Sequence, residues 1–171
     1  MAKVADLIGI YLACNLTSQA ELKYCRQVAP LFNITRRRFN MLQISPHELS
    51  GLLVRQPDAV IIDVRFLHER EEIGFVNGSY HIPLYTPEWD PNPEFMDEVA
   101  KVAGVDTPVI FVCRTGNRSC DACDIAKSQG YHQIYNLRDG YVGLVNLMSQ
   151  ADRENVCQLL NLPGQLQSMY A

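Results

Sequence analysis

The chain has 171 residues, of which 47% are hydrophobic and 20% are charged. A chain of this size can build a full core without disulfides or metals, so one compact domain with short extensions is expected. The net charge of -4 gives no general attraction for nucleic acid or anionic lipid, so a bound anion would need a local site.

The six cysteines are too sparse for the disulfide framework of a small secreted protein, and they lie at positions 14, 25, 113, 120, 123 and 157. We interpret them as reduced thiols of a cytoplasmic protein. The apolar stretch over 4–14 is too short to span a bilayer and is interrupted by Asp6, which disfavours both a membrane segment and an export signal.

Residues 1–40 differ in sequence pattern from the rest of the chain and are predicted to form an N-terminal helical extension. Two helices are expected, over 3–14 and over 17 to about 29, and Pro30 ends the second. Three arginines at 36–38 follow, for which solvated surface is a simpler interpretation than contact with an acidic partner. Covering a sheet edge, docking a partner and forming a homodimer are the hypotheses for this extension.

Short apolar runs alternate with helical stretches over residues 41–149, the predicted main domain, which is typical of βαβ units around a mostly parallel sheet. The predicted strands are apolar and cover 42–44, 59–64, 108–112 and 133–137. One predicted helix starts at a capping box, Ser45-Pro46-His47-Glu48, and two further helices are predicted over 95–103 and 119–129. A last helix over 151–162 is expected in a C-terminal helix and tail, 150–171.

The most informative segment is a short loop between a buried strand and a helix, Cys113-Arg114-Thr115-Gly116-Asn117-Arg118-Ser119. A loop in this position points successive backbone N–H groups inward and adds the positive end of the helix dipole, which makes an anion cradle. Such dipoles, with an arginine beside them, favour a thiolate over a thiol, and the thiolate is the nucleophile. The sequence therefore predicts a reactive cysteine at 113 rather than a buried structural one.

The other loop residues are expected to shape this cradle. Gly116 supplies backbone freedom in a tight curl, while Thr115 and Asn117 can hydrogen-bond the loop to itself. Arg118 is expected either to neutralise an oxyanion held over the sulfur or to fix the loop from outside.

Three motifs, in this order, resemble those of the single-domain rhodaneses, the thiosulfate:cyanide sulfurtransferase superfamily. Asp63-Val64-Arg65 with Glu69 downstream resembles the family's entry motif, and Asp63 ends a strand at the carboxyl edge, where open α/β sheets place functional groups. The segment from Gly74 to Pro83 resembles its pattern of two glycines and an apolar-proline pair. Residues 113–119 resemble its active-site loop, and the match runs from about 44 to 147.

This resemblance implies a rhodanese-like α/β fold, with a central, mainly parallel five-stranded sheet and helices on both faces. It implies a sulfurtransferase in which Cys113 carries a sulfane sulfur as a persulfide and in which the loop backbone binds the transferred group. The implied substrate-binding residues are Arg114, Thr115, Gly116, Asn117, Arg118 and Ser119. Asp63, Arg65 and Glu69 are interpreted as structural support through a buried carboxylate-guanidinium pair.

The implied donor is thiosulfate or another small sulfur-containing anion or persulfide, and the acceptor is a thiol, a cyanide-like nucleophile or a protein. No cofactor, metal, nucleic acid or membrane is expected to take part. The chain departs from the family at residues 1–40, which have no counterpart. It also departs over 139–146, where the end pattern of two glycines followed by a tryptophan is incomplete.

Two other functions remain alternatives. A cysteine-based phosphatase or arsenate reductase uses the same physics, but such phosphatases place five residues between cysteine and arginine, whereas four separate Cys113 from Arg118 here. Val112 also stands where those enzymes have a histidine. A non-enzymatic sulfur-sensing or partner-binding module is the second alternative.

Several neighbouring side chains have roles that the sequence leaves open. Cys120 and Cys123 lie just beyond the loop and are interpreted as core residues, with resolution of a persulfide as the alternative. The aromatic residues that could wall a pocket are Phe66, Tyr80, Tyr85 and Trp89.

Overall fold

The computed structural model describes residues 41–147 and 159–161. The predicted helices over 3–14 and 17–29, the arginines at 36–38 and most of the predicted last helix lie outside these residues. Within the described ranges, no helix is both long enough and apolar enough to cross a bilayer.

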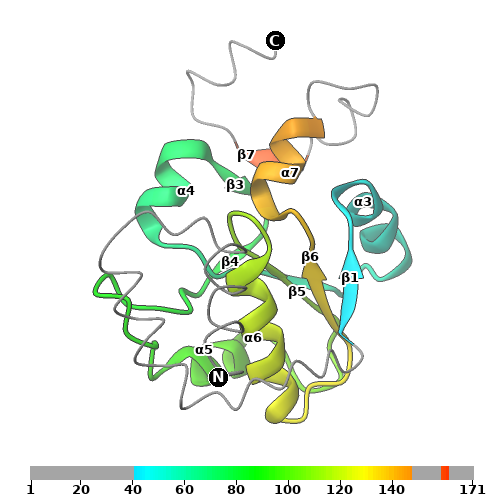
Figure 1. Ribbon diagram of the computed structural model, residues 1–171. Helices are drawn as coiled ribbons and strands as arrows, with labels where there is room; N and C mark the ends of the chain where they lie inside the picture. The colour runs from blue at the N-terminus through cyan, green and yellow to red at the C-terminus, as the bar shows by residue number, and fades with distance from the viewer. Residues whose placement is uncertain (1–40, 148–158, 162–171) are drawn as a thin grey trace, which may run out of the picture.

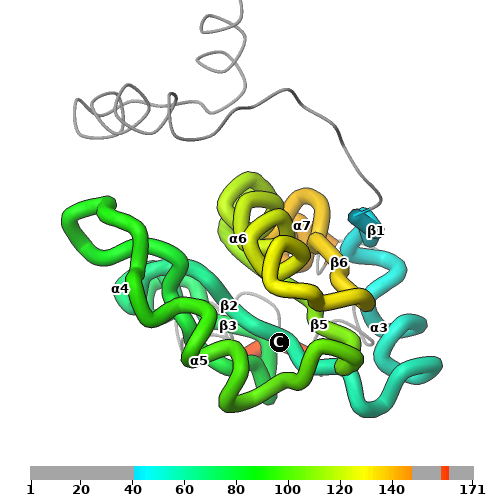
Figure 2. The backbone as a smooth tube through the Cα atoms, turned by 90° about the horizontal axis from the view of Figure 1, so that it is seen from below, coloured from blue at the N-terminus to red at the C-terminus, as the bar shows by residue number. Residues whose placement is uncertain are grey.

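A five-stranded sheet forms the centre of the structure, with the order β1-β6-β5-β2-β4 and every neighbouring pair parallel. Its strands are β1 (Leu42–Ile44), β6 (Ile134–Leu137), β5 (Val109–Val112), β2 (Val60–Asp63) and β4 (Tyr80–His81). The helices are α3 (Pro46–Arg55), α4 (Leu67–Ile73), α5 (Phe95–Val102), α6 (Asn117–Ser128) and α7 (Gly140–Leu147). Helices cover both faces of the sheet (Figures 1 and 2), which confirms the predicted architecture.

The central strand β5 shows why the sheet is covered on both sides. Ile110 and Val112 pack into a core with residues of α3 and α7. Val109, Phe111 and Cys113 pack into the opposite core, with residues of α5 and α6. A strand buried on both faces needs apolar side chains at every position, so the continuous apolar run in the sequence predicts this strand correctly.

Local sequence rules account for several element boundaries. The backbone N–H of Ser45 donates to the Glu48 carboxylate at 2.7 Å, so the predicted capping box is present at the start of α3. Helix α6 begins at Asn117 instead of the predicted Ser119, because Gly116 takes the capping position.

Four features were not predicted, namely α4, α7, the residues of the edge strand β4, and a second, two-stranded antiparallel sheet of β3 (Phe75–Val76) and β7 (Leu160–Asn161). The predicted last helix is wrong at Leu160 and Asn161, which belong to β7. Leu160 is buried in the core beside α3 and α7, so burial and pairing with β3 override the local helical pattern.

The fold brings the ends of three strands together at one edge. Val112 of β5 is in register with Asp63 of β2, and Asp63 is in register with His81 of β4. Because all three strands are parallel, the connections that begin at Cys113, Val64 and Ile82 leave from the same edge of the sheet.

Phe111→Ala tests the core on the α5 and α6 side. Phe111 is 0% exposed, and truncating a fully buried aromatic side chain is expected to lower the free energy of unfolding by about 3–5 kcal/mol. Val54→Ala is the control, because Val54 is 82% exposed on α3 and should change stability by less than about 0.5 kcal/mol. Urea unfolding measures both, and equal effects would contradict this assignment of the core.

Candidate active site

Cys113 follows the last residue of β5 and is 1% exposed. Its Sγ accepts a hydrogen bond from the backbone N–H of Gly116 at 3.1 Å and one from the hydroxyl of Ser119 at 3.3 Å. Both donors come from the segment that joins β5 to the first turn of α6. Two donors therefore point at the atom that the sequence predicts as the nucleophile.

The carbonyl groups of the loop are bound by neighbouring elements. The carbonyl oxygen of Cys113 accepts from the N–H of Tyr141 at 2.8 Å, and that of Arg114 accepts from the N–H of Val142 at 3.1 Å. The carbonyl oxygen of Gly116 accepts from the side-chain amide of Asn136 at 3.1 Å. Because N–H and C=O point in opposite directions across a trans peptide, carbonyls held by α7 and β6 turn the loop's N–H groups toward the inside of the curl.

Two glycines permit this close packing. Gly116 has a φ of 97°, so the backbone freedom predicted for it is used. Gly140, at the start of α7, has a φ of 57°, and a Cβ there would lie 2.5 Å from the carbonyl oxygens of both Cys113 and Arg114. Only glycine lets α7 approach the loop this closely.

Arg118 forms a two-point ion pair with Glu69, with N–O distances of 2.7 and 2.6 Å. Burial by itself would raise the pKa of Glu69, but the hydrogen bonds and charge of Arg118 outweigh it and hold that pKa below its usual value. Burial would likewise lower the pKa of Arg118, but Glu69 and, to a smaller extent, Cys113 raise it. Of the two roles predicted for Arg118, this geometry favours fixing the loop from outside.

A second ion-pair network lies behind the first. Arg65 is 0% exposed and donates to the Asp63 carboxylate at 2.9 and 2.6 Å and to the carbonyl oxygen of Gly74 at 2.8 Å. Its guanidinium lies 4.3 Å from the ring centroid of Tyr141, and Arg70 approaches Asp63 at 3.5 Å. Burial lowers the pKa of Arg70, and Asp63 partly offsets this. The network ties β2 and α4 to α7.

The predicted site residues therefore fall into distinct positions. Gly116 and Ser119 reach the sulfur of Cys113 directly. The Glu69–Arg118 pair and the Asp63–Arg65 pair support the loop separately, whereas the sequence analysis placed Asp63, Arg65 and Glu69 in one supporting group. The side chains of the other three loop residues are exposed, namely Arg114, Thr115 and Asn117.

A family model described as the Rhodanese-like domain matches residues 45–147, which is more than half of the chain. This chain belongs to the rhodanese-like domain family. The resemblance inferred from the three motifs is thereby confirmed.

Relatives and solved structures agree with this membership. A rhodanese domain-containing protein of Drosophila melanogaster is 35% identical over 94 residues, which cover 46% of this chain and 74% of that protein. A sulfurtransferase of Allochromatium vinosum is 30% identical over 100 residues, or 58% and 84% of the two chains. A crystal structure of a protein from M. tuberculosis shares the fold with a TM-score of 0.51 at 30% identity, covering 58% of this chain and 78% of that one.

An aromatic cluster lies beside the ion pair of this rhodanese-like domain. The ring of Phe66 meets Trp89 edge-on at 4.9 Å, and Trp89 lies 6.0 Å from Tyr85. The guanidinium of Arg118 is 5.4 Å from the ring centroid of Phe66 and 5.7 Å from that of Trp89. Of the four aromatic residues left open by the sequence, three gather here, while Tyr80 is 49% exposed on the edge strand β4.

Trp89 reaches this cluster through an unusual backbone conformation. Its φ is 66°, a value that a bulky residue rarely adopts and that costs on the order of 1–3 kcal/mol. The bend is held by hydrogen bonds from the N–H of Trp89 to the carbonyl of Thr86 and from the N–H of Thr86 to the carbonyl of Asp90, both 2.8 Å. The segment between β4 and α5 projects from the body on the side of α4 (Figures 1 and 2).

Sequence reasoning missed several residues that hold the loop. Asn136 was detectable, because it is the only polar residue in the run Ile134–Leu137, and a polar residue in a doubly buried strand needs a partner. Gly140 and Tyr141 act through distances that only the folded chain defines. No sequence pattern indicated that Arg70 would approach Asp63.

The structure also bears on the cysteine beyond the loop. Cys123 is 2% exposed and packs in the same core as Cys113. Burial raises the pKa of the Cys123 thiol well above its usual value, so this sulfur stays protonated at neutral pH. This favours its interpretation as a core residue over a role in resolving a persulfide.

Glu69→Gln tests the ion pair with Arg118. We expect a loss of about 3 kcal/mol in the free energy of unfolding at neutral pH, because a buried guanidinium loses its charged partner. The folded pKa of Glu69 lies below the ordinary value of 4.5, so the stability from this carboxylate is complete above that pH and is lost as the pH falls through the folded pKa. The gap between wild type and variant should therefore close below pH 4.5 in urea unfolding.

Glu72→Gln is the matched control, since Glu72 is exposed on the same helix. It should leave stability nearly unchanged at both pH values. A gap for Glu69→Gln that stays constant as the pH falls would contradict the ionic role of this pair.

Gly140→Ala tests the close approach of α7 to the loop. We expect a loss of at least about 2 kcal/mol in the free energy of unfolding, from the left-handed backbone and from the contact with the two loop carbonyls. Gly78→Ala is the control, because Gly78 has a φ of 73° but no atom within 4 Å of the added Cβ. Thermal unfolding compares them, and an equal loss in both would show that backbone conformation alone matters.

Proposed function

We propose that this rhodanese-like chain is a sulfurtransferase that carries a sulfane sulfur as a persulfide on Cys113. The observation that carries this proposal is the environment of the Cys113 sulfur, with the N–H of Gly116 and the hydroxyl of Ser119 both directed at it. Family membership and relatives named as sulfurtransferases support the same reaction class.

The first half of the reaction loads the cysteine. The Cys113 thiolate attacks the outer sulfur of thiosulfate, the bond between the two sulfurs breaks, and sulfite leaves with its electron pair. The product is a persulfide whose terminal sulfur carries the negative charge. Hydrogen bonds from the inner side of the loop stabilise that charge.

The second half of the reaction removes the sulfur from Cys113. A thiol or cyanide attacks the terminal sulfur, the persulfide bond breaks, and the Cys113 thiolate is released. With cyanide the product is thiocyanate, and with a thiol it is a new persulfide on the acceptor. A related persulfide or polysulfide can replace thiosulfate as the donor, because each presents the same outer sulfur.

The remaining predicted site residues bind the transferred group or hold the loop in place. The backbone of the segment from Arg114 to Ser119 binds the transferred group, and the exposed guanidinium of Arg114 attracts an anionic donor. Glu69 and Arg118 hold the loop against α4, and Asp63 and Arg65 support it from behind. A cytoplasmic location remains a prediction from the sparse cysteines.

The phosphatase or arsenate reductase alternative is weaker. Arg118, which would have to grip a tetrahedral oxyanion over the sulfur, has its two terminal nitrogens bound to Glu69 at 2.7 and 2.6 Å. The curl between Cys113 and Arg118 also holds four residues instead of five.

Intact-mass measurement tests the proposal directly. Incubation with thiosulfate should add one sulfur atom to the wild-type chain, and later addition of cyanide should remove it and yield thiocyanate. Cys113→Ser should abolish the gain, because the hydroxyl is a far weaker nucleophile than a thiolate. Cys120→Ser, in the same helix-loop segment, is the control that should keep it.

Failure of the wild-type chain to gain sulfur from thiosulfate or polysulfide would overturn the proposal. The binding-module alternative would then take its place. Hydrolysis of p-nitrophenyl phosphate that depends on Cys113 would favour the phosphatase instead.

A further inference from the structure

A cavity of about 360 Å³ opens beside α4 and the segment that follows β4. Its lining is mostly apolar or aromatic and includes Phe66, Leu67, Pro83 and Tyr85. Phe66 also lies 5.4 Å from the guanidinium of Arg118, measured to its ring centroid. Its backbone N–H donates to Glu69 at 2.9 Å, so the ion pair that fixes the loop also fixes this wall of the cavity.

Exposed carboxylates surround the cavity and form what we call the acidic rim. Glu71 lines the cavity, and Glu72 follows it on α4. Glu88 and Asp90 belong to the other lining segment, which follows β4, and all four side chains are exposed. None of the four forms an ion pair with another residue of 41–147 or 159–161. Such a rim repels a small anion and attracts a positively charged group.

Charge is divided unequally along the chain. Residues 41–147 contain 15 acidic and 8 basic residues, a net charge of -7, whereas residues 1–40 contain 2 acidic and 6 basic residues, a net charge of +4. Three of these basic residues are consecutive, at 36–38, and Phe39 follows them. Residues 36–39 therefore combine the charge that complements the acidic rim with an aromatic side chain that suits the cavity.

The same copy of the chain cannot place Phe39 in its own cavity. Leu42 begins β1 at one edge of the sheet, while residues that follow β2 and β4, three and four strand spacings away, line the cavity. At about 4.8 Å per spacing this separation is roughly 14–19 Å, but the three residues from Phe39 to Leu42 span at most about 11 Å. The segment must therefore come from another molecule.

We propose that residues 36–39 of a second copy of this chain dock on the acidic rim and place Phe39 in the cavity. A two-fold pair makes this contact twice, because each copy gives its segment to the other. Arginine and aromatic side chains are the groups that most often anchor protein–protein contacts. The proposal assigns contact with an acidic partner to the arginines at 36–38. It does not depend on the proposed function, since it concerns association of the chain and not the chemistry of Cys113.

Sedimentation equilibrium with variants of the whole chain tests the proposal. The rim variant combines Glu71→Lys with Glu88→Lys, and the segment variant combines Arg36→Glu with Arg37→Glu. Each alone should raise the dissociation constant of the dimer by at least about tenfold, because like charges meet at the contact. An equimolar mixture of the two variants should associate as tightly as the wild type, since each segment then meets a rim of opposite charge.

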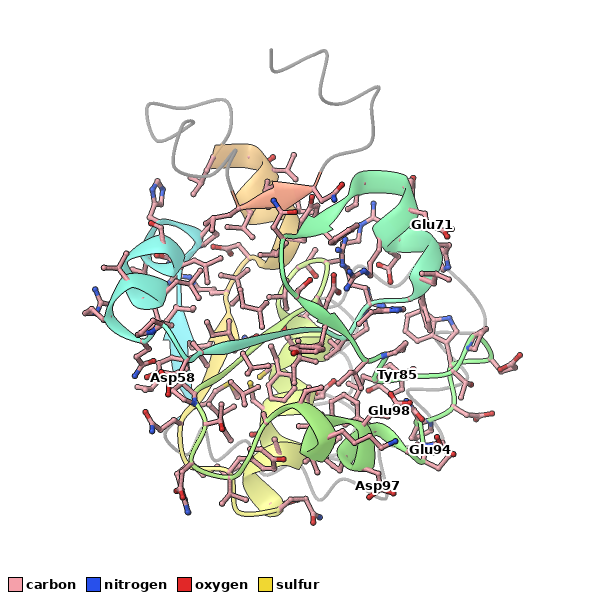
Figure 3. All side chains as sticks on the ribbon, turned by 180° about the vertical axis from the view of Figure 1, so that it is seen from behind. Asp58, Glu71, Tyr85, Glu94, Asp97 and Glu98 are labelled. Atoms are coloured by element: carbon pink, nitrogen blue, oxygen red, sulfur yellow. The ribbon has the colours of Figure 1, made fainter. Side chains whose placement is uncertain are left out.

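The matched control combines Asp58→Lys with Asp106→Lys, which changes the net charge by the same amount as the rim variant. Both residues are exposed and precede β2 and β5, at the edge of the sheet opposite the cavity. Figure 3 shows Asp58 and Glu71 on opposite sides of the molecule. The control should keep the association of the wild type, and mixing it with the segment variant should not restore that association.

Three results would overturn the inference. They are a monomeric wild type, equal weakening by the rim variant and the control, and no recovery when the rim and segment variants are mixed.

Trp89 reports whether the contact lies at this cavity. It is the only tryptophan of the chain, and its ring centroid lies 4.9 Å from that of Phe66. Dilution of the wild type should shift the emission of Trp89 over the same concentration range in which the dimer dissociates, and the segment variant should show no such shift. A dimer whose dissociation leaves this emission unchanged would contradict docking beside Phe66.

Discussion

The conformation of the candidate active-site loop, residues 113–119, depends on where its carbonyl groups are held. Backbone N–H groups at the start of α7 bind the carbonyl oxygens of Cys113 and Arg114, and Asn136 of β6 binds that of Gly116. A peptide unit whose oxygen is fixed on the outside must present its N–H on the inside. The peptide units fixed in this way carry the N–H groups of Arg114, Thr115 and Asn117, so the inward direction of these N–H groups is a consequence of contacts made by two distant elements.

The charged side chains around the loop form two groups. Glu69 and Arg118 neutralise each other across α4 and α6, and behind them Asp63 pairs with both Arg65 and Arg70. Buried charges are tolerated only with such partners, so these pairs hold fixed positions between strands and helices. Their common effect is rigidity, which keeps the loop and the wall formed by Phe66 in one arrangement.

Much of the fold could be predicted from the sequence because the responsible rules are local. The apolar run of β5 predicts a strand buried on both faces, and Ser45 with Glu48 predicts the start of α3. The strand β7 could not be predicted in this way, since Leu160 is placed by pairing with Val76 and by burial. Helix α4 was missed because Phe66 is an uncommon residue at a helix start, and Glu69 supplies the cap instead.

For the candidate site, the sequence by itself determined which cysteine is the candidate nucleophile and that its loop curls around it. Cys113, Gly116 and Ser119 are close in the chain, so their spacing after a strand predicts a curl around the sulfur. The tertiary structure alone decided that Arg118 pairs with Glu69, that Gly140 lets α7 contact the loop, and that Phe66, Tyr85 and Trp89 gather beside it. The physical reason is distance along the chain. Local hydrogen bonding and helix dipoles follow from adjacent residues, whereas partners tens of residues apart are selected only when the whole sheet and its helices pack.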